Sequence, residues 1–353
     1  MRIEGKKRIW EDFQKHIPDD HFFYVRSCIR QSFFPGSEQY FLKVLREELG
    51  KDIYEDPKHT TCTGIGYHGD VVNFDTISAV VARHFALATE HGYKDVVISC
   101  VTSFGIYEEI IETWKHFPEQ LEKTRENLYK ATGREFEVPV SITHSSDIIY
   151  KFRNEIADKA RYKLINKETG KALKVVEHIG CHYSKMFPKY GVGGAEFPHV
   201  LVGMIEAWGG DVIDYPERRH CCGFGFRQYL VQANRGYSVS NSKKKFESME
   251  PYKPDFILAN CPGCTMFMDK WQYTLKAMEN RTYGQYGQGI PVLTYEELAG
   301  IVMGYNPWDL GLQYHNVQSE PLLDKIGVEY DPGNKYLTKD GKVLPAPADL
   351  INV

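Results

Sequence analysis

The chain has 353 residues and a net charge of −4 at pH 7. That length suits two domains of roughly 100–200 residues each. Its 42% hydrophobic and 25% charged residues are typical of a globular protein and argue against long disorder. No basic stripe for nucleic acid is present, and we interpret the short run Lys243–Lys245 as a solvated helix face.

Membrane and secretion signals are absent from the sequence. No stretch approaches the roughly 18 consecutive apolar residues of a membrane span. The N-terminal MRIEGKKRIWEDF lacks the apolar core of a signal peptide. We therefore expect a cytoplasmic protein. Its eight cysteines then indicate metal ligands or redox groups rather than structural disulfides.

Short β-rich runs alternate with helical stretches along the chain. The expected strands are YVRSC at 24–28, DVVISC at 95–100, VVEHIGC at 175–181 and DFILANC at 255–261. The expected helices are 37–50, 75–92, 106–132, 197–209 and 265–279. This alternation predicts an α/β fold of parallel βαβ units. The cysteines fall at strand ends, which is where open α/β sheets place their functional sites.

The two halves of the chain carry the same landmarks in the same order. Cys28 and Cys181 are each followed by Phe-Pro six and seven residues later, and HTTCTGIGY (59–67) matches RHCCGFGF (219–226). Two further matches are the strands that end at Cys100 and Cys261, and the segments 138–152 and 290–305. We expect two tandem pseudo-symmetric copies of one domain at 1–155 and 172–326, followed by a tail at 327–353.

Five cysteines of the second copy come from three strand-end loops. They are Cys181, Cys221, Cys222, Cys261 and Cys264. One zinc ion or one cubane cluster normally takes four ligands, and an adjacent pair is poorly spaced for one small ion. A disulfide between neighbours would be strained. A larger or distorted iron–sulfur assembly would use all five thiolates, and Gly223 and Gly225 would let the backbone approach it.

This pattern resembles the cysteine-rich CCG domain found in the B subunits of heterodisulfide reductases, and the duplication covers nearly all of the chain except its two ends. In that family each copy has the order C, CCG, CxxC, and five cysteines ligate a noncubane [4Fe-4S] cluster. The resemblance implies that Cys181, Cys221, Cys222, Cys261 and Cys264 hold such a cluster here. Each sulfur of the adjacent pair could then reach a different iron.

The first copy departs from this pattern. It keeps Cys28, Cys62 and Cys100, but Thr63 stands in place of the second cysteine of CCG and Ser103 in place of the last cysteine of CxxC. Three alternatives stay open: a second, incomplete iron–sulfur cluster, a different metal or thiol chemistry, or three small buried apolar residues. The groups that could complete a cluster are Ser103, Thr63, His59, His68 or an exogenous sulfur ligand.

Histidines also stand next to two of the expected ligands. His182 follows Cys181, and His220 precedes Cys221. We interpret both as side chains that bond to backbone or pack beside a cluster.

The resemblance implies an iron–sulfur oxidoreductase subunit, similar to the B subunits of the heterodisulfide reductase-like system of sulfur oxidisers. It would act on a thiol, a disulfide or a sulfur carrier such as lipoyl persulfide, with Cys28, Cys62 and Cys100 at the catalytic site. The implied partners are a ferredoxin-like C subunit, a flavin-bearing A subunit and a lipoate-binding carrier protein. The alternatives are an electron-transfer or assembly subunit of a succinate, fumarate or glycolate oxidoreductase with no substrate of its own, and a zinc-stabilised scaffold.

Overall fold

The computed structural model describes residues 2–4, 7–9, 16–59, 62–186, 191–195, 197–224 and 235–336. The chain divides into two compact units that interleave along the sequence. The first unit comprises 1–31, 45–151 and 180–200, and the second comprises 32–44, 152–179 and 201–353. The expected domains at 1–155 and 172–326 would place 32–44 in the first domain and 180–200 in the second, whereas the units place them the other way round. The expected domain boundaries stay a prediction.

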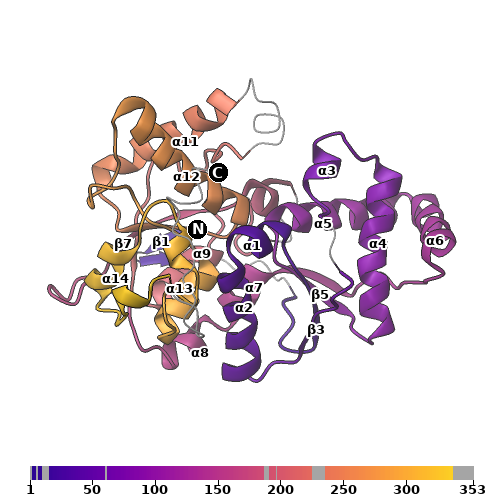
Figure 1. Ribbon diagram of the computed structural model, residues 1–353. Helices are drawn as coiled ribbons and strands as arrows, with labels where there is room; N and C mark the ends of the chain where they lie inside the picture. Colours follow the sequence, from indigo (N-terminus) through magenta and orange to yellow (C-terminus); the bar gives the residue numbers. More distant parts are fainter. Residues whose placement is uncertain are drawn as a thin grey trace. The chain divides into compact units, whose positions relative to one another are not determined.

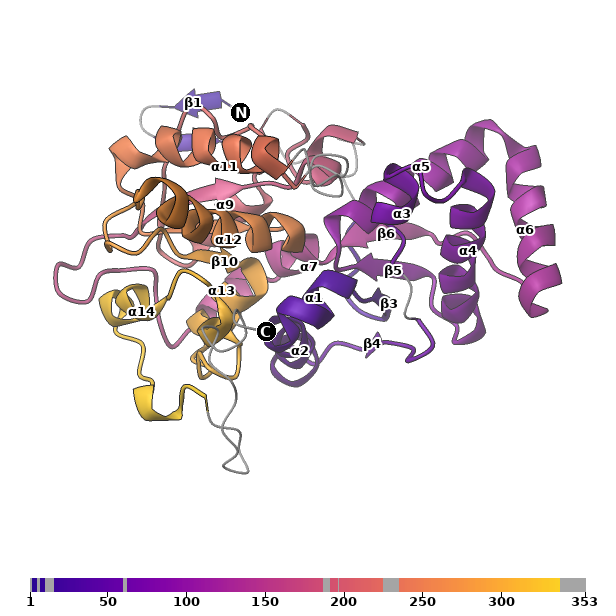
Figure 2. The same cartoon turned by 45° about the horizontal axis from the view of Figure 1, so that its top comes forward.

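The first unit contains a four-stranded parallel sheet. Its strands are β3 (Phe22–Val25), β4 (Ile53–Tyr54), β5 (Asp95–Ile98) and β6 (Ser141–His144). They lie in the order β4-β3-β5-β6, and all neighbours are parallel (Figure 2). The central strand β3 is buried on both faces, as the apolar run FFYV predicts.

The second unit repeats this sheet. Its strands are β7 (Lys174–His178), β8 (Asp211–Val212), β9 (Phe256–Ala259) and β10 (Val292–Thr294). Their order is β8-β7-β9-β10, again with parallel neighbours. The strand β7 is labelled in Figure 1. Matched strand by strand, the two sheets have the same topology. The predicted α/β class with two sets of parallel βαβ units is therefore confirmed.

Helices and one π-helical turn accompany the sheet of the first unit. They are α1 (Cys28–Phe33), α3 (Ile65–His68), α4 (Phe74–Glu90), α5 (Val101–His116), α6 (Pro118–Thr132), α7 (Ser145–Lys151) and the π-helical turn η2 (His182–Met186). The prediction of a single helix at 106–132 is wrong, because two helices cover this range. Pro118 lacks an N–H and disfavours helical backbone at Phe117, so α5 ends and α6 begins there.

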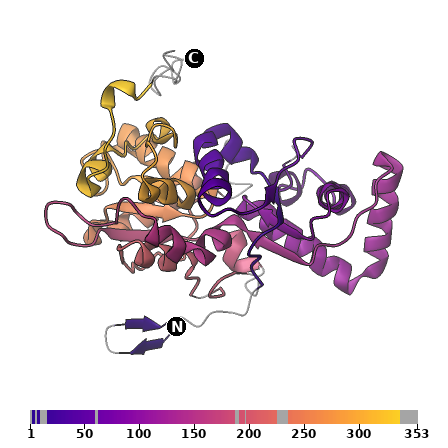
Figure 3. The same ribbon diagram turned by 90° about the horizontal axis from the view of Figure 1, so that it is seen from below.

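The segment between α1 and β4 is also helical. The helix α2 (Pro35–Lys43) continues as the π-helical turn η1 (Val44–Glu48). Near the N-terminus, β1 (Arg2–Glu4) and β2 (Lys7–Ile9) form an antiparallel ribbon (Figure 3).

The helices of the second unit are α8 (Arg153–Asp158), α9 (Val200–Ala207), α11 (Arg235–Met249), α12 (Pro262–Glu279), α13 (Tyr295–Met303) and α14 (Glu320–Ile326). The 3-10 turns are η5 (Glu250–Tyr252), η6 (Leu312–Tyr314) and η7 (Pro332–Asn334). A capping box between Thr294 and Glu297 starts α13. Helices α11 and α12 pack side by side (Figure 2).

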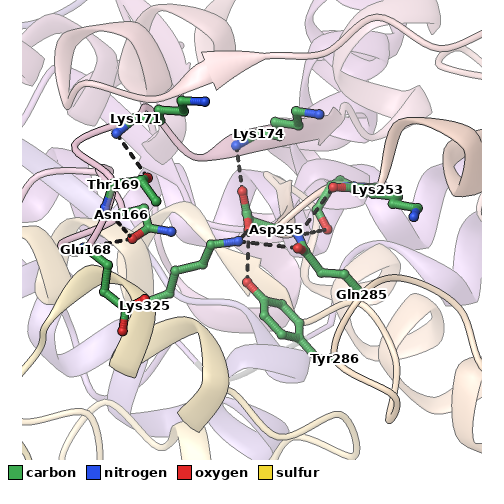
Figure 4. Close-up of polar contacts among 11 residues, drawn as sticks. Asn166, Glu168, Thr169, Lys171, Lys174, Lys253, Asp255, Gln285, Tyr286 and Lys325 are labelled. Atoms are coloured by element: carbon green, nitrogen blue, oxygen red, sulfur yellow. Dashed lines mark hydrogen bonds and ion pairs between the residues drawn. The ribbon is translucent and has the colours of Figure 1, made fainter.

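Asp255 binds several polar groups at the amino end of the second sheet (Figure 4). It directly precedes β9, and its carboxylate accepts hydrogen bonds from the Lys174 N–H at 2.7 Å and from Gln285 at 2.8 Å. The Tyr286 hydroxyl donates at 3.0 Å, and Lys325 forms an ion pair with the same carboxylate. The cysteines follow the strands at the other end of this sheet, so the Asp255 network stabilises the fold away from the candidate site.

Candidate metal centre

The strand β9 leads directly into one pair of cysteines. Cys261 is the N-cap residue of α12, and its sulfur accepts a hydrogen bond from the Cys264 N–H at 3.4 Å. Cys264 lies in the first turn of the helix, and both thiols are buried. In the first unit Cys100 is the N-cap residue of α5, directly after β5. The matched positions of Cys100 and Cys261 support the repeat seen in the sequence.

The adjacent pair lies in the loop after β8. The Gly223 N–H donates to the Cys221 sulfur at 3.3 Å, and the Phe224 N–H donates to the Cys222 sulfur at 3.4 Å. Gly223 has a φ of +90°, and a β-carbon there would lie 2.3 Å from the carbonyl oxygen of Ser238. Only glycine therefore fits this position. Gly225, also singled out in the sequence, lies outside the described residues.

The thiols of these two loops meet in the second unit. Cys222 bonds with both Cys221 and Cys264, and these contacts, together with His178, hold the pKa of the Cys222 thiol well below its usual range. The Cys264 thiol has its pKa raised by its bonds to Cys222 and Cys261 and by burial. Four of the five expected ligands are thus brought together in the second unit.

His178 joins this group and was missed in the sequence. A ring nitrogen of His178 and the sulfurs of Cys222 and Cys264 all lie within 4.8 Å of one another. Burial is the main cause that lowers the pKa of the imidazole, so the ring is neutral and able to bind a metal. Its Nδ1 is buried with no hydrogen-bond partner among the described residues. The signal in the sequence was its place at the end of an apolar strand, whose last four residues are buried, three residues before Cys181.

Cys181 belongs to the first unit, where it begins a chain of polar contacts. Its sulfur lies 3.5 Å from Nδ1 of His182, and Nε2 of His182 lies 2.9 Å from Nδ1 of His68. Nε2 of His68 lies 3.3 Å from Glu109, whose other oxygen accepts from Tyr67 at 2.9 Å. The bond from His68 is the main cause that lowers the pKa of Glu109. His182 therefore contacts the sulfur itself, whereas a backbone or packing role was expected.

His220, the other histidine beside an expected ligand, bonds to side chains. Its Nε2 lies 3.0 Å from Oδ1 of Asn241, and its Nδ1 lies 3.5 Å from Glu217. The described contacts therefore place it in the polar surroundings of the Cys221–Cys222 loop.

The three cysteines of the first copy also converge. The side chains of Cys28 and Cys62 bond to each other, and this bond and the neighbouring Cys62 and Cys100 sulfurs raise the pKa of Cys28. Cys28 and Cys62 are exposed, whereas Cys100 is buried. None of the eight cysteines, all of which lie among the described residues, forms a disulfide. This unit therefore presents a group of three sulfurs, two of them open to solvent.

Two of the residues that could complete this group have other bonds. The Thr63 side chain bonds to Tyr107, and Tyr107 bonds in turn to Nδ1 of His84. His68 bonds to Glu109 and His182, as described above. His59 packs edge-on against His84 with ring centroids 4.8 Å apart, and burial lowers the pKa of His59 to about 4. Ser103 is buried in the first turn of α5.

The interpretation of Lys243–Lys245 as a solvated helix face is wrong for one residue. Lys244 is exposed and Lys243 half-buried, but Lys245 is completely buried. The run lies on α11, and successive residues of a helix point about 100° apart, so the third lysine faces inward. Among the described residues, no helix is long and apolar enough to cross a membrane.

The sulfur groups fit an iron–sulfur cofactor. In the second unit Cys221, Cys222, Cys261 and Cys264 are linked through their sulfurs or backbone, and a ring nitrogen of His178 lies within 4.8 Å of the sulfurs of Cys222 and Cys264. Backbone N–H groups already point at three of these sulfurs, as they do around protein-bound clusters. Thiolate sulfur is the ligand that iron–sulfur clusters take.

The chain is similar to known proteins. Residues 175–269 match the cysteine-rich domain family (CCG). The chain is 25% identical over 322 residues to the B subunit of the ferredoxin:CoB-CoM heterodisulfide reductase of Methanosarcina acetivorans, an alignment that covers 88% of this chain and 98% of the relative. It is 24% identical over 168 residues to the membrane anchor subunit of the 8-methylmenaquinol:fumarate reductase of Wolinella succinogenes, which covers 48% of this chain and 54% of that protein.

A solved structure of a hypothetical protein from Helicobacter pylori has the same fold. The TM-score is 0.61 at 14% identity, and the match covers 88% of this chain but only 55% of that structure. The family match is confined to the second copy, whereas the sequence predicted two CCG domains. The chain thus carries one recognisable CCG domain and is similar, over most of its length, to the B subunits of heterodisulfide reductases.

Proposed function

We propose that this protein is an iron–sulfur redox subunit that acts on sulfur compounds within a heterodisulfide reductase-like complex. The observation that carries the proposal is the convergence of Cys221, Cys222, Cys261 and Cys264 with His178 at the carboxyl end of the second sheet. The similarity to the B subunits of heterodisulfide reductases extends over 85–88% of the chain, which supports a whole-chain relationship.

The proposed ligand set comprises these four cysteines and Cys181, and the proposed cofactor is a noncubane [4Fe-4S] cluster. Bound there, it would supply one-electron transfer. The protein's own contribution is visible in the described residues. N–H groups from Gly223, Phe224 and Cys264 donate to sulfur, and burial of Cys222, Cys261 and Cys264 excludes water from one side of the site.

The first copy is the proposed substrate site. Cys28 and Cys62 are solvent-exposed and lie next to the buried Cys100, so a sulfur compound can approach the group from solution. Cys28, Cys62 and Cys100 would hold an incomplete cluster that leaves room for the substrate sulfur. Reduction of a disulfide there consumes two electrons and two protons and releases two thiols. The electrons would come from an iron–sulfur or flavin-bearing partner subunit.

The proposed substrate class is a disulfide, thiol or lipoyl persulfide. The proposed partners are a ferredoxin-like C subunit, a flavin-bearing A subunit and a lipoate-binding carrier, as in sulfur oxidisers.

A second function is an electron-transfer or assembly subunit without its own substrate. The similarity to the fumarate reductase subunit of W. succinogenes favours it, although this match covers about half of each chain. The two functions differ in the first copy, because only a substrate site requires Cys28, Cys62 and Cys100 to react with an added sulfur compound.

Anaerobic purification followed by iron, zinc and sulfide analysis and EPR tests the proposal. We expect iron and acid-labile sulfide, little zinc, and an EPR signal that changes when a small disulfide or dihydrolipoyl compound is added. A colourless protein with stoichiometric zinc would contradict the redox function. Iron with no spectral response to any thiol or disulfide would favour the electron-transfer subunit.

A further inference from the structure

Three inward-facing residues of α11 bind the backbone around the adjacent cysteines. Ser238, Ser242 and Lys245 are spaced by four and three residues, which places them on one face of the helix. All three are completely buried. Polar side chains at such positions are costly unless they are hydrogen-bonded, so their partners indicate their role.

Their partners are carbonyl oxygens of one short segment. Ser238 donates to the carbonyl of Gly223 at 2.5 Å, and Ser242 donates to the carbonyl of Cys222. The Lys245 ammonium donates to the carbonyls of Glu217, Arg218 and His220 at 2.8, 2.9 and 3.3 Å. Five carbonyls between residues 217 and 223 are therefore held by three side chains of one helix. This segment contains Cys221 and Cys222.

The helix α11 contacts both α12 and the loop that carries the two cysteines. Trp271 of α12 donates its indole N–H to the Ser238 hydroxyl at 3.0 Å, so the bonds link α12, α11 and the loop. Gly223 approaches the backbone of Ser238 so closely that a β-carbon would lie 2.3 Å from its carbonyl oxygen. The close approach and the hydroxyl bonds act together to fix where the two cysteines emerge from the loop.

Lys245 also brings a positive charge to the sulfurs. Its side chain is buried beside the loop, and its Nζ lies 4.9 Å from the centroid of the Tyr215 ring. Burial lowers the pKa of Lys245 to about 7, while Glu177 and the thiols of Cys222, Cys264 and Cys221 favour its charged form. In its protonated form Lys245 offsets part of the negative charge that sulfur ligands concentrate here.

The matching helix of the first unit makes a different set of contacts. On α4, the Ser78 hydroxyl donates to the carbonyl of Phe74 in the same helix, and Arg83 donates to the carbonyl of Lys58. In that copy Thr63 replaces the second cysteine of the pair. The bonds from three helix side chains to the loop carbonyls are thus described in the copy that has both cysteines of the pair.

We propose that Ser238, Ser242 and Lys245 are positioning residues for the Cys221–Cys222 loop, and that the Lys245 ammonium raises the reduction potential of the group bound there. The charge effect rests on the proposed iron–sulfur function, whereas the positioning role holds for the protein's own backbone. Reduction adds negative charge to the site, so a nearby cation favours the reduced state.

Two matched pairs of variants test the proposal in the full-length protein. Lys245→Met is compared with Lys276→Met, a change at an exposed lysine of α12, and Ser242→Ala is compared with Ser240→Ala, which changes an exposed serine of α11. Amide hydrogen exchange of residues 215–224 reports the positioning role with or without iron. We expect at least a tenfold faster exchange in Lys245→Met and Ser242→Ala and wild-type exchange in the two controls. Equal exchange within each pair would overturn the positioning role.

The midpoint potential of the iron-loaded protein reports the charge. We expect a lower midpoint potential in Lys245→Met, and a smaller change in Lys245→Arg, which keeps the charge. A wild-type midpoint in folded, iron-loaded Lys245→Met would overturn the charge effect. If Lys245→Met does not fold, the comparison of Ser242→Ala with Ser240→Ala decides the positioning role. Lys245→Arg compared with Lys276→Arg then shows whether exchange of the loop depends on the shape of the lysine side chain. A wild-type protein without iron would contradict the proposed function, while the exchange comparison would still test the positioning.

Discussion

Nε2 of His182 lies 2.9 Å from Nδ1 of His68, and this contact joins the turn after Cys181 to α3 of the same unit. The two rings are also stacked, with centroids 4.9 Å apart. His68 is held on its other side by Glu109 on α5. The contact therefore fixes the residue next to an expected ligand through two other elements of the unit.

Replacing His68 with phenylalanine should loosen this turn. The ring volume is kept, but the bonds to His182 and Glu109 are lost, so we expect a loss of about 1–2 kcal/mol in the free energy of unfolding. Amide exchange across 181–186 should become faster. His116→Phe, a change at an exposed histidine of α5, is the control. Unchanged exchange at 181–186 would show that the turn is held by other contacts.

Replacing Cys222 with serine should remove the cluster of the second unit. A neutral hydroxyl is a poor substitute for a thiolate, and Cys222 is the thiol whose pKa the surrounding groups lower most clearly. Iron per chain and visible absorption should fall, and the EPR signal of this cluster should disappear. Replacing Ser240 with alanine leaves the ligand set intact and serves as the control. A variant with the wild-type spectrum would exclude Cys222 as a ligand.

Replacing Cys100 with serine should separate the two sites. We expect turnover of a small disulfide or lipoyl substrate to fall at least a hundredfold, while the EPR signal assigned to the second unit remains. Cys100 lies in the other sheet's strand-end loop, so its loss leaves Cys222, Cys261 and Cys264 in place. Retained turnover with unchanged iron content would make the first copy a scaffold and favour the electron-transfer function.

The sheets and the sulfur groups could be predicted because their signals are local. Apolar runs such as FFYV and FILA mark buried parallel strands, and the cysteines follow them directly. The break at Pro118 was equally local, since proline cannot continue the preceding helix, but the single helix expected at 106–132 ignored it.

Other features depend on contacts between distant parts of the chain. The burial of Lys245 is set by the rotation of α11 against the 217–223 segment, which a run of three lysines does not reveal. His178 is one histidine at a strand end, and only the folded loops bring Cys222 and Cys264 to it. The grouping of 32–44 with the second unit reflects packing between α2 and α13, more than 250 residues apart in sequence.

Replacing Asp255 with asparagine should destabilise the second unit without touching the sulfurs. Asp255 is almost completely buried, and its carboxylate is the partner of Lys325 and of three hydrogen-bond donors. An amide loses the charge and part of the acceptor capacity, so we expect a loss of about 2–4 kcal/mol in denaturant unfolding. Asp158→Asn, at an exposed position, is the control. Iron content should be unchanged at low temperature, and a loss of iron with wild-type stability would contradict this assignment.

The buried pair of His315 and Glu297 should make stability depend on pH. Nε2 of His315 lies 2.9 Å from Oε1 of Glu297, and the side chains are 1% and 0% exposed. Burial alone would lower the pKa of His315, but the charges of Glu297 and Asp269 and the bond to Glu297 raise it to about 9. The folded pKa thus exceeds the unfolded value near 6.5. The protonated pair stabilises the fold fully below about pH 6.5, and this contribution is lost as the pH rises through about 9.

Replacing His315 with glutamine isolates this contribution. We expect the variant to be less stable than the wild type by about 3 kcal/mol at pH 6, and the difference to shrink steadily up to pH 9.5. Urea unfolding at several pH values measures it, and subtracting the variant from the wild type removes the titration of other groups. The exposed His116→Gln should differ little from the wild type at any of these pH values. A stability difference that stays constant from pH 6 to 9.5 would contradict this prediction. It would mean that His315 is neutral in the folded protein and that Glu297 does not stabilise a protonated His315.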